Sequence, residues 1–263
     1  MSSDPIGRVR PWRWLGLTLL ALAGAVLLLQ IWYAANIWWW RTHPVGETSF
    51  MSYRMDELRD KQAAARTAAG AKSQAQGKAR PGESTRVSEP VLRYQWVPYE
   101  RISNHLNRAM IAAEDAKFVD HEGFDWDGIQ KAIAKNEKRG RVVAGGSTIT
   151  QQLAKNLFLT PSRSYLRKVE EAVITLMLEA ILDKRRIFEI YLNVIELGNG
   201  VFGAEAAARR YFNVSAAQLS PEHAARLAAM APNPRFYERN PGAPGLNRKI
   251  GIILARMPSA DLP

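Results

Sequence analysis

The longest uninterrupted apolar stretch of the chain lies close to its N-terminus. The 27 residues from 14 to 40 contain no charged side chain. As a helix they would extend about 40 Å, which exceeds the ~30 Å hydrocarbon core of a bilayer. Tryptophans stand near both ends, as in the aromatic belts of membrane-spanning helices. The pattern therefore predicts a transmembrane anchor over residues 14–40.

A cleaved signal peptide is the competing interpretation of this stretch. Such a peptide has an apolar region of about 7–15 residues followed by small residues at the cleavage site. Here the apolar region is longer and ends in the bulky Trp38–Trp40. The arginines Arg8, Arg10 and Arg13 precede it, which predicts that residues 1–13 form a cytoplasmic tail. We expect a single-pass protein of the cytoplasmic (inner) membrane whose remaining residues lie in the periplasm.

Residues 41–90 predict a juxtamembrane segment and a linker. Residues 41–60 mix polar and apolar side chains and fit a short helix. From Lys61 to Pro90, Val87 is the only apolar side chain larger than Ala or Pro. Such a stretch cannot bury a core, so we interpret it as a linker or a poorly ordered loop whose Ala-rich start is compatible with helix.

Apolar residues recur at helical spacing along most of residues 91–263. Strand signals are weak apart from an extended stretch that ends near Pro98. Cap signals and periodicity predict helices after Ser103, from Asp127, over 148–157, 163–182, 187–195 and 204–212, and from Pro221. The predicted fold class is therefore mostly α, with one core.

Charge and composition narrow the chemistry. The net charge is +11 and the chain has no cysteine, which excludes disulfides and thiolate chemistry. Nucleic acid is not expected as a partner, because the anchor would place the basic domain outside the cytoplasm. An anionic lipid surface or a phosphorylated substrate fits the charge better.

A cluster of acids stands out against this basic background. Six acids occur among the fourteen residues from Glu114 to Asp127. Glu114 ends an apolar helix, where partial burial would raise its pKa and suit it to act as a general base. A solvated acidic loop is the plain alternative. A calcium loop is disfavoured, because the EF-hand spacing is not satisfied.

The segment that follows is cationic. Between Gly128 and Lys168 nine Lys or Arg face one acid. Gly145 and Gly146 precede Ser147 and Thr148, either of which can cap a helix whose N-terminus suits an anion. Gln151, Gln152 and Lys155 lie on that helix. A simple turn is the alternative, and the stretch fails the P-loop pattern because no Gly-Lys-Ser/Thr follows.

A third candidate lies in the longest predicted helix. Arg167 and Glu171 are four residues apart and share a face, which Lys168 flanks and Arg163 joins if the helix starts early enough. A surface salt bridge is the alternative, but the neighbours of Glu171 are apolar. Two carboxylates suit glycosyl chemistry, and a row of cations suits a pyrophosphate leaving group.

The chain resembles the peptidoglycan glycosyltransferases of glycosyltransferase family 51. The resemblance covers residues 97–237 and is carried, in order, by the stretches AAEDAKFVDHEGFD, GGSTITQQLAKN, RKVEEAVITLMLE, RRIFEIYLNVIELGNGVFGAEAAARRYF and HAARLAAMAPNP. It implies a lysozyme-like, mostly helical catalytic domain over residues 91–263. It also implies polymerisation of lipid II into β-1,4-linked glycan strands, with inversion and release of undecaprenyl pyrophosphate. No Ser-x-x-Lys motif occurs, so we expect a monofunctional enzyme.

The resemblance also implies roles for individual residues. Glu114 would be the general base and Glu171 the second acid. Asp115 would orient the first motif, where Lys117 replaces the family's usual Arg and leaves its own role open. The residues expected to bind substrate are Asp115, Lys117, Ser147, Gln151, Gln152, Lys155, Asn156, Arg163, Arg167 and Lys168.

Cofactors and partners follow from the same resemblance. Mg²⁺ or Mn²⁺ would stimulate the reaction without being tightly bound, and no organic cofactor is expected. The expected partners are lipid II, the growing glycan strand, membrane lipids and proteins of cell division or cell-wall synthesis, with no nucleic acid. Phe118, Phe124 and Trp126 would either dock on the bilayer or belong to the core.

Two other functions stay open at this point. One is a membrane-anchored, lysozyme-like lytic enzyme that cuts the same polymer, although a sugar leaving group would need fewer cations. The other is a non-catalytic scaffold that binds lipid-linked precursors. The presence of both Glu114 and Glu171 argues against the scaffold.

Overall fold

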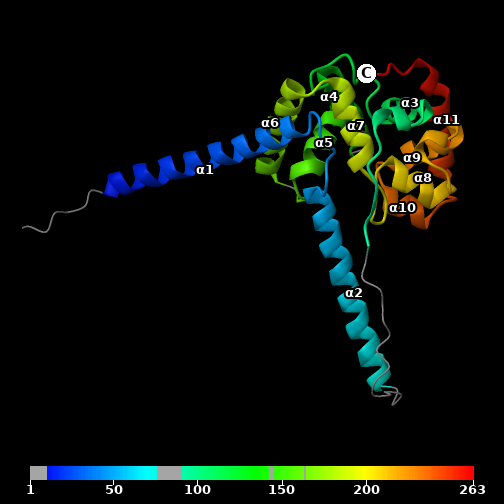
Figure 1. Cartoon of the computed structure of the whole chain (residues 1–263), viewed down its shortest axis with the longest axis horizontal. Coiled ribbons are helices and arrows are strands. Elements are labelled where there is room, and N and C mark those ends of the chain that lie inside the picture. Colours follow the sequence, from blue (N-terminus) through cyan, green and yellow to red (C-terminus); the bar gives the residue numbers. More distant parts are fainter. Residues whose placement is uncertain (1–10, 76–90, 142–144, 163) are drawn as a thin grey trace, which may run out of the picture.

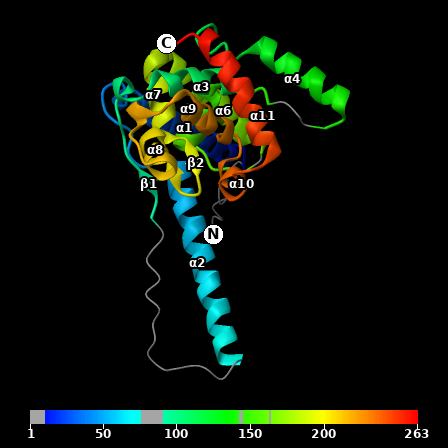
Figure 2. The ribbon, with the colours of Figure 1, turned by 90° about the vertical axis from the view of Figure 1, so that its right-hand side faces the viewer.

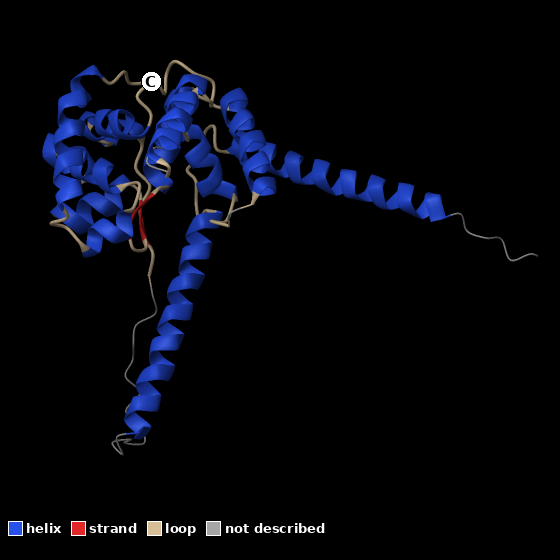
Figure 3. Cartoon of the chain, turned by 180° about the vertical axis from the view of Figure 1, so that it is seen from behind, coloured by secondary structure: helices blue, strands red, loops and turns tan. Residues whose placement is uncertain are grey.

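The computed structural model describes residues 11–75, 91–141, 145–162 and 164–263 (Figure 1). The expected tail over residues 1–13 therefore lies mostly outside the described residues, and so do Arg8, Arg10 and Arg163. Helices dominate the structure and the strands are confined to one small ribbon (Figure 3). The predicted mostly α fold is confirmed.

Helix α1 (Pro11–Trp39) contains the apolar stretch. Its residues Trp14–Trp39 have a mean hydropathy of 2.1 and form a candidate membrane-spanning helix. Most of α1 projects away from the rest of the molecule (Figure 1). The last turns of α1 contact the domain instead. Tyr33 and Ile37 are buried there, and Tyr33 donates a 2.5 Å hydrogen bond to Glu170 Oε1. The C-terminal end of α1 is thus packed into the domain.

Helix α2 (Ser49–Ala75) occupies most of the segment interpreted as juxtamembrane and linker. Phe50, Met51 and Arg54 in its first turns are buried against the domain. The rest of α2 extends away from it, in a different direction from α1 (Figures 1 and 2). Ala, Gln, Arg and Lys are good helix formers, so this stretch stays helical without burying an apolar face. The Ala-rich start is therefore helical, as the composition allowed.

The remaining helices form the domain that carries the site. They are α3 (Asn104–Glu114), α4 (Trp126–Arg139), α5 (Ile149–Phe158), α6 (Tyr165–Ile181), α7 (Lys184–Val194), α8 (Ala204–Phe212), α9 (Pro221–Met230), α10 (Pro234–Arg239) and α11 (Pro244–Arg256). Short 3-10 turns span Tyr99–Arg101, Ala216–Gln218 and Met257–Ser259. Helix α6 begins two residues later than expected, because Ser164 caps it by accepting from the N–H of Arg167.

A three-stranded ribbon lies beside these helices. Strand β1 (Arg93–Tyr94) pairs in parallel with β3 (Val201–Phe202), which pairs antiparallel with β2 (Glu196–Gly198). Strands β2 and β3 form a hairpin. It ends at Gly203, whose φ is +80° and where a Cβ would lie 2.2 Å from the carbonyl oxygen of Asn193. Only glycine fits this position.

Two sets of helices build the core. Helix α5 packs against α2, α6 and α7, whereas α3 packs against α9 and α11. Thr148 caps α5 through a capping box in which the Gln151 side chain accepts from the N–H of Thr148. Phe118 is fully buried in the core, so the suggestion that it docks on the bilayer is wrong. Trp126 is 67% exposed and stacks on Phe124.

Candidate active site

Glu114 ends α3 and faces α5. Its Oε2 accepts a 2.9 Å hydrogen bond from the Gln152 amide, while its Oε1 is buried and has no hydrogen-bond partner among the described residues. Burial raises the pKa of Glu114, and the Gln152 hydrogen bond and the charges of Lys249 and Lys155 oppose this rise only in part. A carboxylate with one free oxygen and a raised pKa is suited to accept a proton.

The backbone behind Glu114 is fixed by its neighbour Asp115. This buried carboxylate accepts from the N–H of Ile149 at 3.0 Å and from His121 Nε2 at 3.1 Å. Ile149 is the first residue of α5, so Asp115 joins the end of α3 to the start of α5. The predicted orienting role of Asp115 thus corresponds to a definite set of contacts.

Tyr191 lies behind the Glu114–Gln152 pair. Its hydroxyl donates to Gln152 Oε1 at 3.2 Å, which orients the amide so that Gln152 Nε2 points to Glu114. Burial raises the pKa of Tyr191 well above its usual value, so the hydroxyl keeps its proton and serves as a donor. Sequence analysis missed Tyr191, because it is 39 residues away from Gln152 along the chain.

The second carboxylate is surrounded by cations. Glu171 is 3% exposed and accepts from Arg167 Nη1 at 2.8 Å and from the Lys168 ammonium. The predicted face shared by Arg167 and Glu171 is therefore present, and it is partly buried rather than a surface pair. Arg167 Nε is buried without a partner among the described residues, which leaves a donor available.

Lys155 interacts electrostatically with both carboxylates. Burial lowers the pKa of its ammonium group, and the nearby charges of Glu171 and Glu114 act in the opposite direction. Lys155 also lines a polar pocket of about 210 Å³ together with Gln152, Asn156 and Tyr191. The Asn156 amide donates to the carbonyl of Gln152 at 2.7 Å. This pocket is the place where an anionic group would meet Lys155.

The far wall of this pocket comes from an unexpected part of the chain. Arg54 of α2 lines it and is held by Glu196 of β2 at 2.9 Å. Glu57 accepts from Arg54, Lys61 and Arg235, and these contacts hold α2 to α10. No local sequence signal connects α2 with the site, so sequence analysis did not include Arg54.

Glu114 itself lines a second, smaller pocket. It measures about 170 Å³ and is lined by Glu114, Ala229 of α9, and Lys249 and Ile253 of α11. Burial raises the pKa of Glu114, and the charge of Lys249 opposes this rise, so the ammonium group is near the carboxylate. Glu114 is therefore accessible from a side that carries a second cation.

The other predicted site residues fall into three groups. Gln151 is buried, and its side-chain oxygen completes the cap of α5. Lys117 and Ser147 are exposed; Lys117 pairs with Asp127 at 3.2 Å, and Ser147 precedes the cap residue Thr148. Arg163 lies outside the described residues.

The acidic residues between Glu114 and Asp127 make different contacts. Glu114 and Asp115 turn inward, Asp125 caps α4 by accepting from the N–H of Gly128, and Asp127 pairs with Lys117. Asp120 and Glu122 are exposed. Throughout the described ranges, no group of three or more His, Asp or Glu side chains could hold a metal ion. The stimulation by Mg²⁺ or Mn²⁺ stays a prediction.

Comparison with known proteins identifies the class to which this fold and site belong. A family model described as Transglycosylase matches residues 83–258. The chain therefore belongs to the transglycosylase family, and the activity that this family indicates is glycosyl transfer.

Individual relatives match along nearly the whole chain. A protein of Dechloromonas aromatica is 62% identical over 251 residues, which cover 95% of this chain and 98% of the relative. A protein of Azoarcus sp. is 56% identical over 252 residues, with 96% and 98% covered, and one of Chromobacterium violaceum is 53% identical over 245 residues, with 93% and 96% covered. Each of the three is named biosynthetic peptidoglycan transglycosylase.

Proposed function

We propose that this protein is a peptidoglycan glycosyltransferase that polymerises lipid II into β-1,4-linked glycan strands. The observation that carries the proposal is the half-buried Glu114, with one free oxygen and a raised pKa, close to the cationic cluster of Lys155, Arg167 and Lys168. The names of the relatives, which match along nearly the entire chain, support the same substrate class.

In this proposal Glu114 acts as the general base. It takes the proton of the acceptor 4-hydroxyl as that oxygen attacks the anomeric carbon of the donor sugar. The bond from this carbon to the pyrophosphate oxygen breaks as the new bond forms on the opposite face, so the configuration inverts. The raised pKa of Glu114 makes its carboxylate a stronger base than an exposed one.

The cations stabilise the leaving group. Undecaprenyl pyrophosphate leaves as an anion, which needs charge neutralisation more than it needs a proton. Lys155 supplies a partly desolvated ammonium group, and Arg167 and Lys168 flank it from α6. Glu171 holds these two cations in place and limits their repulsion. A divalent cation on the pyrophosphate would assist them.

The proposed location rests on α1 as a membrane anchor. With α1 in the inner membrane and the N-terminus in the cytoplasm, the domain lies in the periplasm, where a lipid-linked donor can reach the cleft. Membrane lipids, the growing strand and proteins of cell-wall synthesis are its expected partners. A lytic enzyme is less well supported, because cleavage between two sugars releases no phosphate for the cluster around Lys155 to bind.

The test is polymerisation of labelled lipid II by the full chain in detergent. Wild type is expected to make long strands that lysozyme digests, and Glu114→Gln to lose at least about 100-fold in rate, as expected when a general base is removed. Glu122→Gln is the matched control, because Glu122 is exposed in the same acidic loop. Equal rates for wild type and Glu114→Gln would refute the assigned base, and release of fragments from purified cell walls would favour the lytic enzyme.

A further inference from the structure

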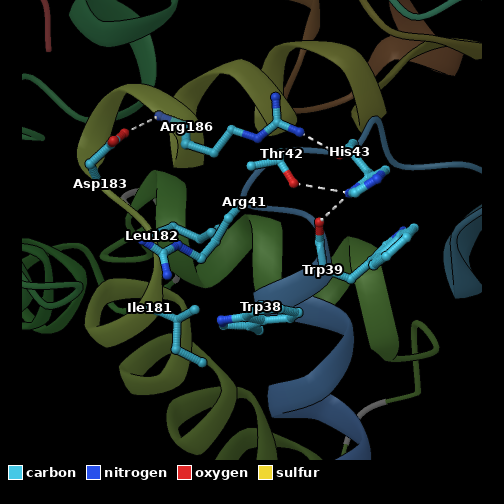
Figure 4. A pocket seen from close by; sticks show the side chains of 9 residues that line it. All are labelled: Trp38, Trp39, Arg41, Thr42, His43, Ile181, Leu182, Asp183 and Arg186. Atoms are coloured by element: carbon cyan, nitrogen blue, oxygen red, sulfur yellow. Dashed lines mark hydrogen bonds between the residues drawn. The ribbon is translucent and has the colours of Figure 1, made fainter.

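A third pocket lies where α1 meets the domain. It measures about 400 Å³, which is within the range of small-molecule sites. The last turn of α1 contributes Trp38 and Trp39, and the end of α6 contributes Ile181. Arg41 and Arg186 complete its polar part (Figure 4). The proposed function uses none of these residues.

One wall of this pocket is rigidly built. Arg186 of α7 donates from Nε to the carbonyl of Trp40 at 2.7 Å and from Nη2 to the carbonyl of His43. Its Nη1 pairs with Glu189 at 2.6 Å, and its guanidinium lies over the Trp96 ring. Two of the three side-chain nitrogens of Arg186 therefore fix the turn that follows α1, and the third pairs with Glu189 within α7.

The same turn also orders the aromatic side chains. The His43 ring stacks on Trp39 with centroids 3.6 Å apart, and its Nδ1 lies 3.1 Å from the Trp39 carbonyl oxygen. Trp38 is 61% exposed, and Figure 4 shows the nitrogen-bearing end of its indole turned toward Ile181. The pocket thus offers an indole N–H beside aliphatic surface.

Arg41 is a charged residue of the pocket that has no ion-pair partner among the described residues. Its side chain is exposed and makes no ion pair within the part of the chain that the structure describes. The one acid in the lining, Asp183, uses its Oδ1 to accept from the N–H of Arg186 at the start of α7. An anion in the pocket would therefore meet one unpaired guanidinium group.

The position of the pocket indicates the source of this anion. Trp38 and Trp39 end the candidate membrane-spanning stretch, so they would lie at the headgroup level of the bilayer. Along α6, the step from Lys168 to Ile181 corresponds to about 20 Å at 1.5 Å per residue. The pocket is therefore separate from the cluster around Glu171.

We propose that this pocket binds the headgroup of one anionic phospholipid of the phosphatidylglycerol class. The phosphodiester accepts from the guanidinium of Arg41 and the indole N–H of Trp38. The upper part of an acyl chain lies against Ile181, and the rim polar groups of Thr42 and Asp183 face the glycerol hydroxyls. The inference rests on the membrane location included in the proposed function.

The test uses the full chain purified in detergent and mixed with equal amounts of phosphatidylglycerol and phosphatidylcholine. Native mass spectrometry measures which lipid is retained. Wild type is expected to retain one phosphatidylglycerol in preference to phosphatidylcholine. Arg41→Gln should reduce this preference about fivefold, the factor typical of one basic residue at an anionic membrane surface. Trp38→Leu keeps the apolar bulk but removes the N–H, and should reduce it less.

Arg59→Gln is the matched control. Arg59 is exposed on α2, where it makes only a long 3.8 Å pair with Asp56, so its replacement removes the same charge outside the pocket. The control should retain phosphatidylglycerol as wild type does. Equal retention of both lipids by wild type, or an equal loss in Arg59→Gln and Arg41→Gln, would overturn the proposal.

Two further measurements distinguish the lipid-site proposal from the proposed enzyme activity. All variants should float with vesicles of the two lipids, because the apolar stretch of α1 that precedes Trp38 is the same in each of them; a wild type that does not float would overturn the lipid site. Lipid II polymerisation is measured on the same samples. Selective retention of phosphatidylglycerol without polymerisation would support the lipid site and refute the proposed enzyme activity.

Discussion

Gln152 Nε2 lies 2.9 Å from Glu114 Oε2, so an amide on α5 holds the carboxylate at the end of α3. The contact does two things at once. It orients Glu114 so that Oε1 stays free, and it favours the charged form of the carboxylate, which opposes the effect of burial on its pKa. Base strength at this site is therefore set by both helices.

Replacing Gln152 by Leu should move the pH dependence of the reaction. Loss of the amide donor disfavours the carboxylate form, so the pKa of Glu114 rises further and the acidic limb of the rate profile shifts to higher pH. The measurement is the polymerisation rate as a function of pH. Gln130→Leu, at an exposed position of α4, should leave the profile unchanged. An acidic limb that stays in place in Gln152→Leu would contradict the coupling.

The alkaline limb of the profile of polymerisation rate against pH should depend on Lys155. Burial lowers the pKa of this ammonium group, so it loses its proton at a lower pH than an exposed lysine. Affinity for a pyrophosphate-bearing ligand should therefore fall as the pH rises through this lowered pKa. Lys155→Met should bind more weakly, by about tenfold, with a flatter pH dependence. Lys131→Met is the control at an exposed position, and a wild-type affinity independent of pH would disprove the role.

Glu171→Gln should weaken both turnover and folding. The buried carboxylate holds Arg167 and Lys168, and its neutralisation leaves two cations close together. We expect a loss of about 3 kcal/mol in the free energy of unfolding and a larger fall in kcat than in lipid II affinity. Thermal or denaturant unfolding measures the first, and single-turnover kinetics with ligand binding measures the second.

The matched comparison for Glu171 is the pair between Arg185 and Glu100. Both side chains of that pair are more than half exposed, so Glu100→Gln should cost at most about 1 kcal/mol. Equal destabilisation by Glu100→Gln and Glu171→Gln would show that burial of Glu171 adds nothing to its ion pairs.

Docking of α2 should be sensitive to acid. The hydrogen bond from Lys61, together with Arg54 and Arg235, lowers the pKa of Glu57 to about 2. A carboxyl group with a lowered pKa stabilises the folded state above its unfolded pKa and loses this effect as the pH falls. Between about pH 4.5 and 2 the first turns of α2 should therefore become less protected against amide hydrogen exchange.

Glu57→Gln should produce the same loss of protection at neutral pH, with a cost of about 1 kcal/mol. Asp56→Asn is its control on the same helix, because Asp56 is exposed and makes only the 3.8 Å pair with Arg59. If both variants exchange as wild type does, the Glu57 contacts do not hold α2.

Local sequence patterns predicted the parts of the structure that depend on near neighbours. The apolar run over residues 14–40 predicted helix α1, and the four-residue spacing predicted the pair of Arg167 and Glu171. The sequence left open whether Ser147 or Thr148 caps the helix, because both hydroxyls precede it. In the structure Thr148 is the cap and forms a capping box with Gln151.

Contacts between distant segments were not predictable in this way. Nothing in the sequence near Arg54 indicates that it meets Glu196, 142 residues later. Phe118 and Trp126 are both aromatic, but Phe118 is buried and Trp126 is exposed. Phe118 packs against Phe188 of α7. Pairwise geometry of this kind follows only from the folded chain.

The packing of Tyr33 and Ile37 into the domain affects how this chain can be shortened. Trp32, Tyr33 and Trp40 all lie against Phe158, the last residue of α5. Cutting the chain before residue 41 would therefore expose Phe158 and leave Glu170 without its tyrosine. The C-terminal turns of α1 are therefore a packed part of the domain, and α1 is held at a fixed angle to α5.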